Sequence, residues 1–231
     1  MAAAPQPPTT LSFEDARHTV ERHASEVRPV GTESVDLLAS LGRVLAQSVS
    51  ADRDFPPFRR AMRDGYAVRA ADLAHLPATL QVVGEIKAGV APEDLPLEIG
   101  PGQAAGIMTG APASNGSDAV VMIEYTALKG DLVTITKGVA RGDNIVPVGS
   151  EAHKGQMLMP PGTRMDYAGI GLAASVGLET LTVYRRPKVA ILSTGDEIVE
   201  INAQPGPHQI RNSNSYSLAA QVEAAGARQI F

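Results

Sequence analysis

The apolar residues near the start of the chain recur at the three- and four-residue spacing of an amphipathic helix. The residues on this face are Phe13, Ala16, Val20 and Ala24. Ser12 precedes the run and Asp15 follows three positions later, which is close to a capping box for a first helical turn. The pattern predicts a helix over 13–25. Beyond it, residues 33–50 predict a short strand and then a helix over 37–45, with Gly42 as a break.

From position 55 to 148 the pattern changes to short apolar runs separated by Gly and Pro. The runs are 80–83, 104–108, 119–125 and 132–136. Several short strands with turn residues between them predict a compact β-rich unit, barrel-like in form. The Lys-Gly-Asp sequence at 129–131 predicts a hairpin connection.

A third pattern follows position 149. A short helix is predicted over 165–177 with Gly177 at its end, and strands over 181–184 and 189–192. The second strand is a continuous apolar run, typical of a parallel sheet buried on both faces. Asn214 is predicted to cap a helix that Gly226 ends.

Residues 227–231 predict the start of another strand, in what would be a doubly wound α/β domain. One strand and one helix cannot bury a parallel sheet on both faces. We therefore expect the chain to end inside its last domain.

Composition excludes several classes of protein. The net charge of -5 argues against a general nucleic-acid binder, which needs a basic surface. The absence of cysteine excludes disulfides, thiolate nucleophiles and iron–sulfur ligation, so any metal must be bound by oxygen or histidine. Residues 1–10 predict a disordered tail rather than a signal peptide, and no run approaches the ~18 apolar residues of a membrane span. We expect a cytoplasmic protein without nucleic-acid or membrane partners.

The segment 54–69 holds a candidate functional carboxylate. Pro56 and Pro57 restrict the backbone before Asp64, and Gly65 permits a turn. Arginines at 59, 60 and 63 suggest an anionic ligand whose charge is shared between arginines and metal-binding carboxylates. An ordinary Asp-Gly turn with solvated arginines is the alternative.

A second candidate lies where the run 189–192 ends in Ser193, Thr194, Gly195, Asp196 and Glu197. Ligands of open α/β sheets bind outside the carboxyl ends of the strands. The two hydroxyls and nearby amides suit a phosphate, which the two acids would repel unless Mg²⁺ bridged them. A strand-ending turn with two solvated acids is the alternative.

Two further segments are weaker candidates. Thr109 lies between an apolar run and a Gly-Ala-Pro turn, and turn chemistry alone can explain it. Glu151 lies in a polar stretch that also suits an interdomain linker. The sequence contains no motif for covalent catalysis, and the five histidines have no ligand spacing. Metal-assisted transfer on a phosphate-bearing ligand is the better fit.

Taken together, these motifs resemble the molybdopterin molybdenumtransferase family, which includes MoeA and the gephyrin E domain. The resemblance covers positions 13–231 and rests on six ordered segments: 55–58 with 64–68, 84–89, 107–112, 118–122, 141–145 and 192–197. It implies insertion of molybdate into adenylyl-molybdopterin with release of AMP, dependence on Mg²⁺, and a homodimer. A molybdopterin adenylyltransferase is the implied pathway partner.

The resemblance also implies a discontinuous architecture. Residues 53–149 would form a β-rich domain inserted into a linker domain of 27–52 and 150–185. Residues 186–231 would begin a molybdopterin-binding, MogA-like α/β domain, on which a helix at 11–26 packs. The chain alone would then be inactive, because the C-terminal part of the site is absent.

Matching motifs assign Asp64, Thr109 and Glu197 to the active site, in a cleft between two subunits. Glu151 and Asp196 would be acidic partners there, with Asp196 and Glu197 as metal ligands. The loop before Asp64 departs from the family pattern, which usually has Asn-Ser-Ala-Met where this chain has 60–63 as Arg-Ala-Met-Arg. Two alternatives remain open: a noncatalytic binding or scaffold protein of this architecture, and a sibling adenylyltransferase, which would not need the first 185 residues.

Overall fold

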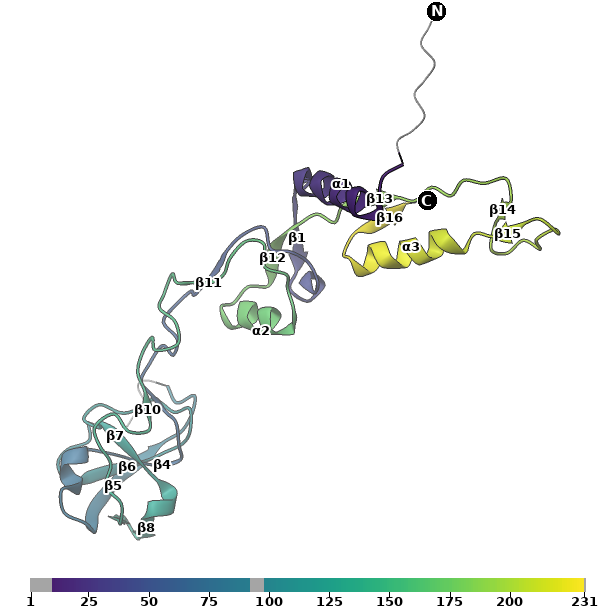
Figure 1. Ribbon diagram of the computed structural model, residues 1–231. Helices are drawn as coiled ribbons and strands as arrows, with labels where there is room; N and C mark the ends of the chain where they lie inside the picture. The colour runs from purple at the N-terminus through teal and green to yellow at the C-terminus, as the bar shows by residue number, and fades with distance from the viewer. Residues whose placement is uncertain (1–9, 92–97, 231) are drawn as a thin grey trace, which may run out of the picture. The chain divides into compact units, whose positions relative to one another are not determined.

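The computed structural model describes residues 10–91 and 98–230. The chain divides into two compact units, one made of Val49–Met159 and the other of the segments before and after it (Figure 1). The tail predicted over 1–10 falls almost entirely outside the described residues. The fold as a whole is a sheet-rich α/β fold.

A curled six-stranded sheet is the centre of the Val49–Met159 unit. Its strands, in chain order, are β4 (Gly65–Val68), β5 (Ala78–Ile86), β6 (Gln103–Ile107), β7 (Ala119–Met122), β8 (Thr126–Lys129) and β9 (Leu132–Ile135). Their order in the sheet is β7-β4-β6-β5-β9-β8, and all pairs are antiparallel except β5–β6. Within the described residues β7 and β8 do not pair, so the sheet is open at those edges and the predicted barrel does not close.

Side chains from both faces of this sheet are buried. Tyr66 and Val68 point into one apolar cluster, which also contains Val121. Ala67, between them on β4, belongs to a second cluster on the opposite face, as the two-residue period of a strand requires. The ends of β4 and its neighbours are therefore held from both sides, which gives the loops attached there a rigid base.

Two short ladders complete this unit. β3 (Arg60–Ala61) pairs with β10 (Ile145–Val146), and β2 (Val49–Ser50) pairs with β11 (Met157–Met159). A 3₁₀ turn, η2 (Ala70–Leu73), follows β4. The predicted hairpin at 129–131 is confirmed between β8 and β9. The run predicted as one strand over 119–125 is strand only to Met122, after which a 3₁₀ turn, η4 (Ile123–Tyr125), follows.

The first helix of the other unit, α1 (Phe13–Glu26), is confirmed. The Ser12 hydroxyl accepts a hydrogen bond from the Asp15 amide at 3.1 Å, as its capping role requires. The apolar side chains of this helix are exposed, with Phe13 75% exposed and Val20 68% exposed. Packing of the helix on the α/β segment remains a prediction.

The predicted helix over 37–45 is wrong. β1 (Thr32–Asp36) pairs with β12 (Thr180–Tyr184), and only a short 3₁₀ turn, η1 (Leu38–Ser40), follows it. Val44 and Leu45 instead form bridges with Arg164 and Val183. The flanking amides pair with the same two segments, since Gly42 donates to the Met165 carbonyl and Ala46 to the Thr182 carbonyl. Tertiary pairing overrides helix propensity here. The predicted helix over 165–177 is confirmed as α2 (Tyr167–Ser175), which Asp166 caps.

The last segment contains β13 (Lys188–Ala190), β14 (Ile198–Val199), β15 (Ile210–Arg211), α3 (Ser213–Ala224) and β16 (Arg228–Ile230). β13 and β16 pair in parallel, so the strand predicted at the chain's end is confirmed for its described residues. Figure 1 shows α3 running beside this pair.

Two expectations for this segment are wrong. The run 189–192 is not buried on both faces, because its sheet has two strands here: Val189 is 37% exposed and Leu192 86% exposed. The cap of α3 is Asn212 rather than Asn214, which lies within the helix. Either asparagine could cap a helix, and the sequence places both in one polar run.

Candidate functional site

Asp64 and Thr109 are brought together by the register of β4 and β6. Gly65 pairs with Ile107 in this antiparallel ladder, so the residue before β4 and the residues just after β6 lie at the same edge of the sheet. The Asp64 Oδ1 accepts two hydrogen bonds from Thr109, one from the amide at 2.6 Å and one from the hydroxyl at 2.8 Å. These two residues, far apart in the sequence, form one polar element.

The loop that carries Thr109 is itself fixed by main-chain hydrogen bonds to β3. Gly110 donates to the Ala61 carbonyl at 2.9 Å, and Ala61 donates to the Ala111 carbonyl at 2.9 Å. Ala111 in turn donates to the Met108 carbonyl and closes the turn around Thr109. Because Ala61 and Ala111 are buried, this turn cannot move without disturbing the core.

The Asp64 carboxylate is exposed and ionised. The Thr109 amide and then its hydroxyl lower the pKa of Asp64 below its ordinary value, because both donate hydrogen bonds that stabilise the charged form. Both bonds end on Oδ1, and among the described residues no hydrogen-bond donor is recorded on Oδ2. Oδ2 therefore faces solvent as a negatively charged hydrogen-bond acceptor whose position is fixed through Oδ1.

Gly65 is required at this site by close packing. Its φ is +156°, and a Cβ there would lie 1.9 Å from the Val121 carbonyl oxygen of β7. Meanwhile the Asp64 carbonyl accepts a hydrogen bond from the Ile123 amide at 3.0 Å. The sequence suggested that this glycine permits a turn, whereas the structure shows that it permits two strands to approach on one side of the candidate site.

The predicted clustering of arginines around Asp64 is wrong. The Arg59 guanidinium donates to the carbonyls of Ser114 and Ser117, which fixes it to a different loop. Arg60 forms an ion pair with Glu151 at 3.0 Å. Within the described part of the chain, no arginine or lysine lies within ion-pair distance of Asp64.

Glu151 lies in the same unit as Asp64. Its side chain is exposed and contacts Arg60, and its amide donates to the Phe55 carbonyl at 2.9 Å. Phe55 and Ala152 also form a bridge, so the segment that carries Glu151 is paired with the start of the Asp64 loop. No recorded contact among the described residues joins the Glu151 and Asp64 side chains directly.

The candidate phosphate site lies in the other unit, at the N-terminus of α3. The Ser193 hydroxyl donates to Asn212 Oδ1 at 3.1 Å and lies 2.5 Å from the buried Ser215 hydroxyl. A pocket of about 300 Å³ opens beside them, lined by Leu192, Ser193, Thr194, Ile198, Ile210, Arg211, Asn212, Ser213, Asn214 and Leu218. A helix N-terminus that faces hydroxyls is favourable for an anion.

Sequence reasoning missed Asn212 and Ser213 as part of this site. Their signal is the polar run Arg-Asn-Ser-Asn at 211–214 immediately before a helix, which capping rules could have placed at a helix N-terminus. What the rules could not give is the pairing of β14 with β15, which brings this run opposite Thr194 and Ser193.

Glu197 folds back over Gly195. The φ of Gly195 is +148°, and a Cβ on this residue would lie 2.5 Å from a carboxylate oxygen of Glu197. Asp196 is exposed beside it. Among the described residues no group of three or more His, Asp or Glu side chains gathers as a metal site. The two acids fit Mg²⁺ only as part of a donor set that a ligand's phosphate oxygens would complete, which is the usual mode for this ion.

The candidate residues thus fall into two separate groups. Asp64, Thr109 and Glu151 belong to the Val49–Met159 unit, and residues 193–197 belong to the other unit. No helix in the described part of the chain is long and apolar enough to span a membrane.

Comparisons with known proteins give the family. Residues 11–177 match the model of the MoeA N-terminal region (domain I and II). The molybdopterin molybdenumtransferase of Nostoc sp. is 41% identical over 204 residues, which are 87% of this chain and 46% of that protein. The Bacillus subtilis protein of the same name is 39% identical over 208 residues, which are 87% of this chain and 48% of that protein.

A solved structure gives the same result. The structure of the molybdopterin biosynthesis MoeA protein from Pyrococcus horikoshii OT3 superposes with a TM-score of 0.84 at 30% identity, over 93% of this chain and 57% of that one. The chain spans about half the length of the curated relatives that it matches. By its sequence and its fold, the chain belongs to the family of the MoeA N-terminal region.

Proposed function

We propose that the protein acts in molybdenum cofactor biosynthesis, where it inserts molybdate into adenylyl-molybdopterin and releases AMP. The family match and the names of the relatives support this reaction class. The observation that carries the proposal is the exposed Asp64 carboxylate, whose Oδ1 is held by the amide and hydroxyl of Thr109. A carboxylate that is held in one orientation at the end of a paired strand is a suitable group for orienting a ligand.

The architecture that we propose is that of the resemblance. Residues 53–149 form an inserted β-rich domain, 27–52 with 150–185 form a linker domain, and 186–231 begin a molybdopterin-binding, MogA-like α/β domain. The helix at 11–26 packs on that last domain. In a homodimer, Asp64 of one subunit would meet Glu197 of the other across the reaction cleft.

Asp64 has a role in positioning in this proposal. Because its pKa is lowered, it is a weak base at neutral pH and remains charged. We therefore assign it to accepting hydrogen bonds from the substrate through Oδ2 rather than to removing a proton. Thr109 keeps the carboxylate in one orientation, and Glu151 contributes further negative charge from the same unit.

The pocket at the start of α3 would hold a phosphate of the substrate. The Ser193 and Thr194 hydroxyls and the first amides of the helix are its donors, with Gly195 leaving space for the Glu197 side chain. Asp196 and Glu197 would hold Mg²⁺ together with phosphate oxygens. When bound, this ion would neutralise the phosphate charge next to the two acids.

The test is release of AMP from adenylyl-molybdopterin by a protein of the relatives' full length that contains this chain. We expect release to require both molybdate and Mg²⁺. Binding of adenylyl-molybdopterin without AMP release would instead support the noncatalytic scaffold. Because the substrate is the product of an adenylyl transfer, we also propose a cytoplasmic molybdopterin adenylyltransferase as the pathway partner.

A further inference from the structure

A second pocket lies in the unit that contains β1 and β12, away from every residue assigned above. Its volume is about 360 Å³. Five arginines line it: Arg28, Arg43, Arg164, Arg185 and Arg186. The whole chain has 20 lysines and arginines and a net charge of -5, so a quarter of its basic residues line one pocket of an acidic chain. Among the described residues, no aspartate or glutamate lines the pocket.

A ladder of extended segments positions these arginines. Val44 bridges to Arg164 on one side, and the Tyr184 amide donates to the Val44 carbonyl at 2.8 Å on the other. Tyr184 pairs in turn with Thr32 at the end of β1. The arginine-bearing segments are therefore neighbours by main-chain hydrogen bonding, and the charge concentration is built into the fold.

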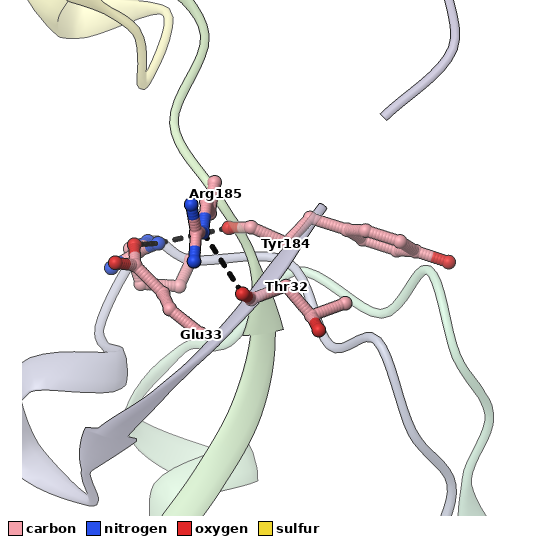
Figure 2. A network of polar contacts seen from close by, with 5 residues as sticks. Thr32, Glu33, Tyr184 and Arg185 are labelled. Carbon is pink, nitrogen blue, oxygen red and sulfur yellow. Dashed lines mark hydrogen bonds and ion pairs between the residues drawn. The ribbon is translucent and has the colours of Figure 1, made fainter. Parts of the chain in front are cut away.

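Only part of this positive charge is balanced within the chain. Figure 2 shows Arg185 pointing to Thr32, whose carbonyl accepts a hydrogen bond from Nε at 3.0 Å. Arg43 is buried and pairs with Glu33, and it also donates to the Tyr184 carbonyl at 2.8 Å. Arginine lowers the pKa of Glu33, first through the Arg43 hydrogen bond and also through the charges of Arg43, Arg185 and Arg228. Glu33 is the one carboxylate recorded in an ion pair with a lining arginine among the described residues.

The remaining walls are mainly apolar. They include Val27, Pro29, Val30, Val44, Tyr184, Pro187 and Ala225. Pockets for small molecules usually start at about 300 Å³ and combine an apolar wall with a few polar groups that fix orientation. This pocket has both features, with guanidinium groups as the polar part. Arginine is the side chain best suited to two-point recognition of phosphate.

We propose that this pocket binds a small organic phosphate with an apolar body. The phosphate contacts the exposed guanidinium groups of Arg164 and Arg186, while the apolar part lies against Val44 and Pro187. A bare inorganic anion would leave the apolar wall in contact with water, and a neutral apolar molecule would give the Arg164 and Arg186 guanidinium groups no charged partner. The site shares no lining residue with the pocket at Ser193, so it is independent of the proposed reaction.

Phenyl phosphate is a suitable probe, with inorganic phosphate and phenol as its two halves. We expect saturable binding of phenyl phosphate to the chain by isothermal titration calorimetry, at least about tenfold tighter than either half. In ¹H–¹⁵N spectra the largest shifts should fall on the amides of Tyr184, Arg185 and Gly226. Because the contacts are solvent-accessible ion pairs, binding should weaken as salt is raised.

Two variants test the location. Arg164→Ala combined with Arg186→Ala should weaken phenyl phosphate binding by at least about tenfold, since both side chains are exposed and neither forms a hydrogen bond or ion pair with the residues that the structure describes. Arg17→Ala, which removes an exposed arginine of the same unit that pairs with Glu21, is the matched control and should change binding less than twofold.

Four results would overturn the proposal. One is the absence of saturable phenyl phosphate binding at millimolar concentration, and another is binding that the double variant leaves unchanged. The third is equal affinity for inorganic phosphate, which would mean that the apolar wall contributes nothing. Spectral shifts confined to Ser193 and Asn212 would assign the phosphate to the other pocket and would equally contradict this site.

Discussion

Gly65→Ala is expected to be the most damaging small substitution next to the candidate site. The added Cβ would lie 1.9 Å from the Val121 carbonyl oxygen, and this is a backbone atom of a buried strand that cannot turn aside. Either β4 or β7 must move, although both are central to the two apolar clusters. The backbone of Gly65 also has a φ of +156°, a value that residues other than glycine seldom adopt.

The magnitude follows from these two effects. Overpacking a filled core costs about 1–3 kcal/mol, and holding a residue with a Cβ in an unfavourable φ region costs about 1–3 kcal/mol more. We expect Gly65→Ala to lower the free energy of unfolding of the Val49–Met159 unit by about 3 kcal/mol. Gly130→Ala is the matched control, because that glycine has a φ of +62° but open space around its Cβ position. It should cost about 1–2 kcal/mol.

Native-state hydrogen exchange of the β4 and β6 amides, such as those of Ala67 and Ala105, measures the loss directly. These amides lie in the ladder that sets Asp64 beside Thr109. A Gly65→Ala protein whose β4 amides are as protected as those of Gly130→Ala would refute the close-packing argument. It would also remove the reason to regard the position of Asp64 as fixed by the sheet.

Three further predictions concern single hydrogen bonds. Thr109→Val should raise the pKa of Asp64 toward its ordinary value, measured by NMR titration; because a lowered pKa gives stability above the ordinary carboxyl value that is lost on acidification, the variant should be less stable than the wild type at neutral pH and the difference should disappear as the pH is lowered. Asn212→Ala should destabilise α3 by about 1 kcal/mol, seen as faster amide exchange in its first turn; unchanged exchange would contradict its capping role. Arg60→Ala should change the free energy of unfolding by less than about 1 kcal/mol in urea denaturation, because its ion pair with Glu151 is solvent-accessible; a larger loss would mean that the pair supports the loop.

Local rules predicted the elements whose structure is determined locally. α1 follows from the spacing of its apolar residues and the Ser12 cap, and the β8–β9 hairpin follows from a Lys-Gly-Asp turn. Four strands of the curled sheet, β5, β6, β7 and β9, were found because each contains a short apolar run ended by turn residues, whereas β8 was not among the predicted runs. In these cases the pattern within the segment itself indicates its conformation.

Expectations failed where distant segments decide the outcome. Val44 and Leu45 are not helical because they form bridges with Arg164 and Val183, more than 100 positions away. Arg59 and Arg60 were expected beside Asp64 but bind partners in other loops. The partner of Asp64 was likewise not evident from sequence spacing, because the antiparallel register of β4 and β6 brings Thr109 to it.

The central claim is that Asp64, held by Thr109, is the part of the reaction site that this chain's β-rich unit supplies. The most direct test is the rate of molybdate-dependent AMP release for Asp64→Asn in a protein of full length. The control is Asp131→Asn, an exposed hairpin aspartate that accepts a hydrogen bond from Gln81. We predict that Asp64→Asn reduces the rate by at least about 100-fold while the fold and the Asp131→Asn rate stay as in the wild type. Equal rates for the two variants would contradict the claim.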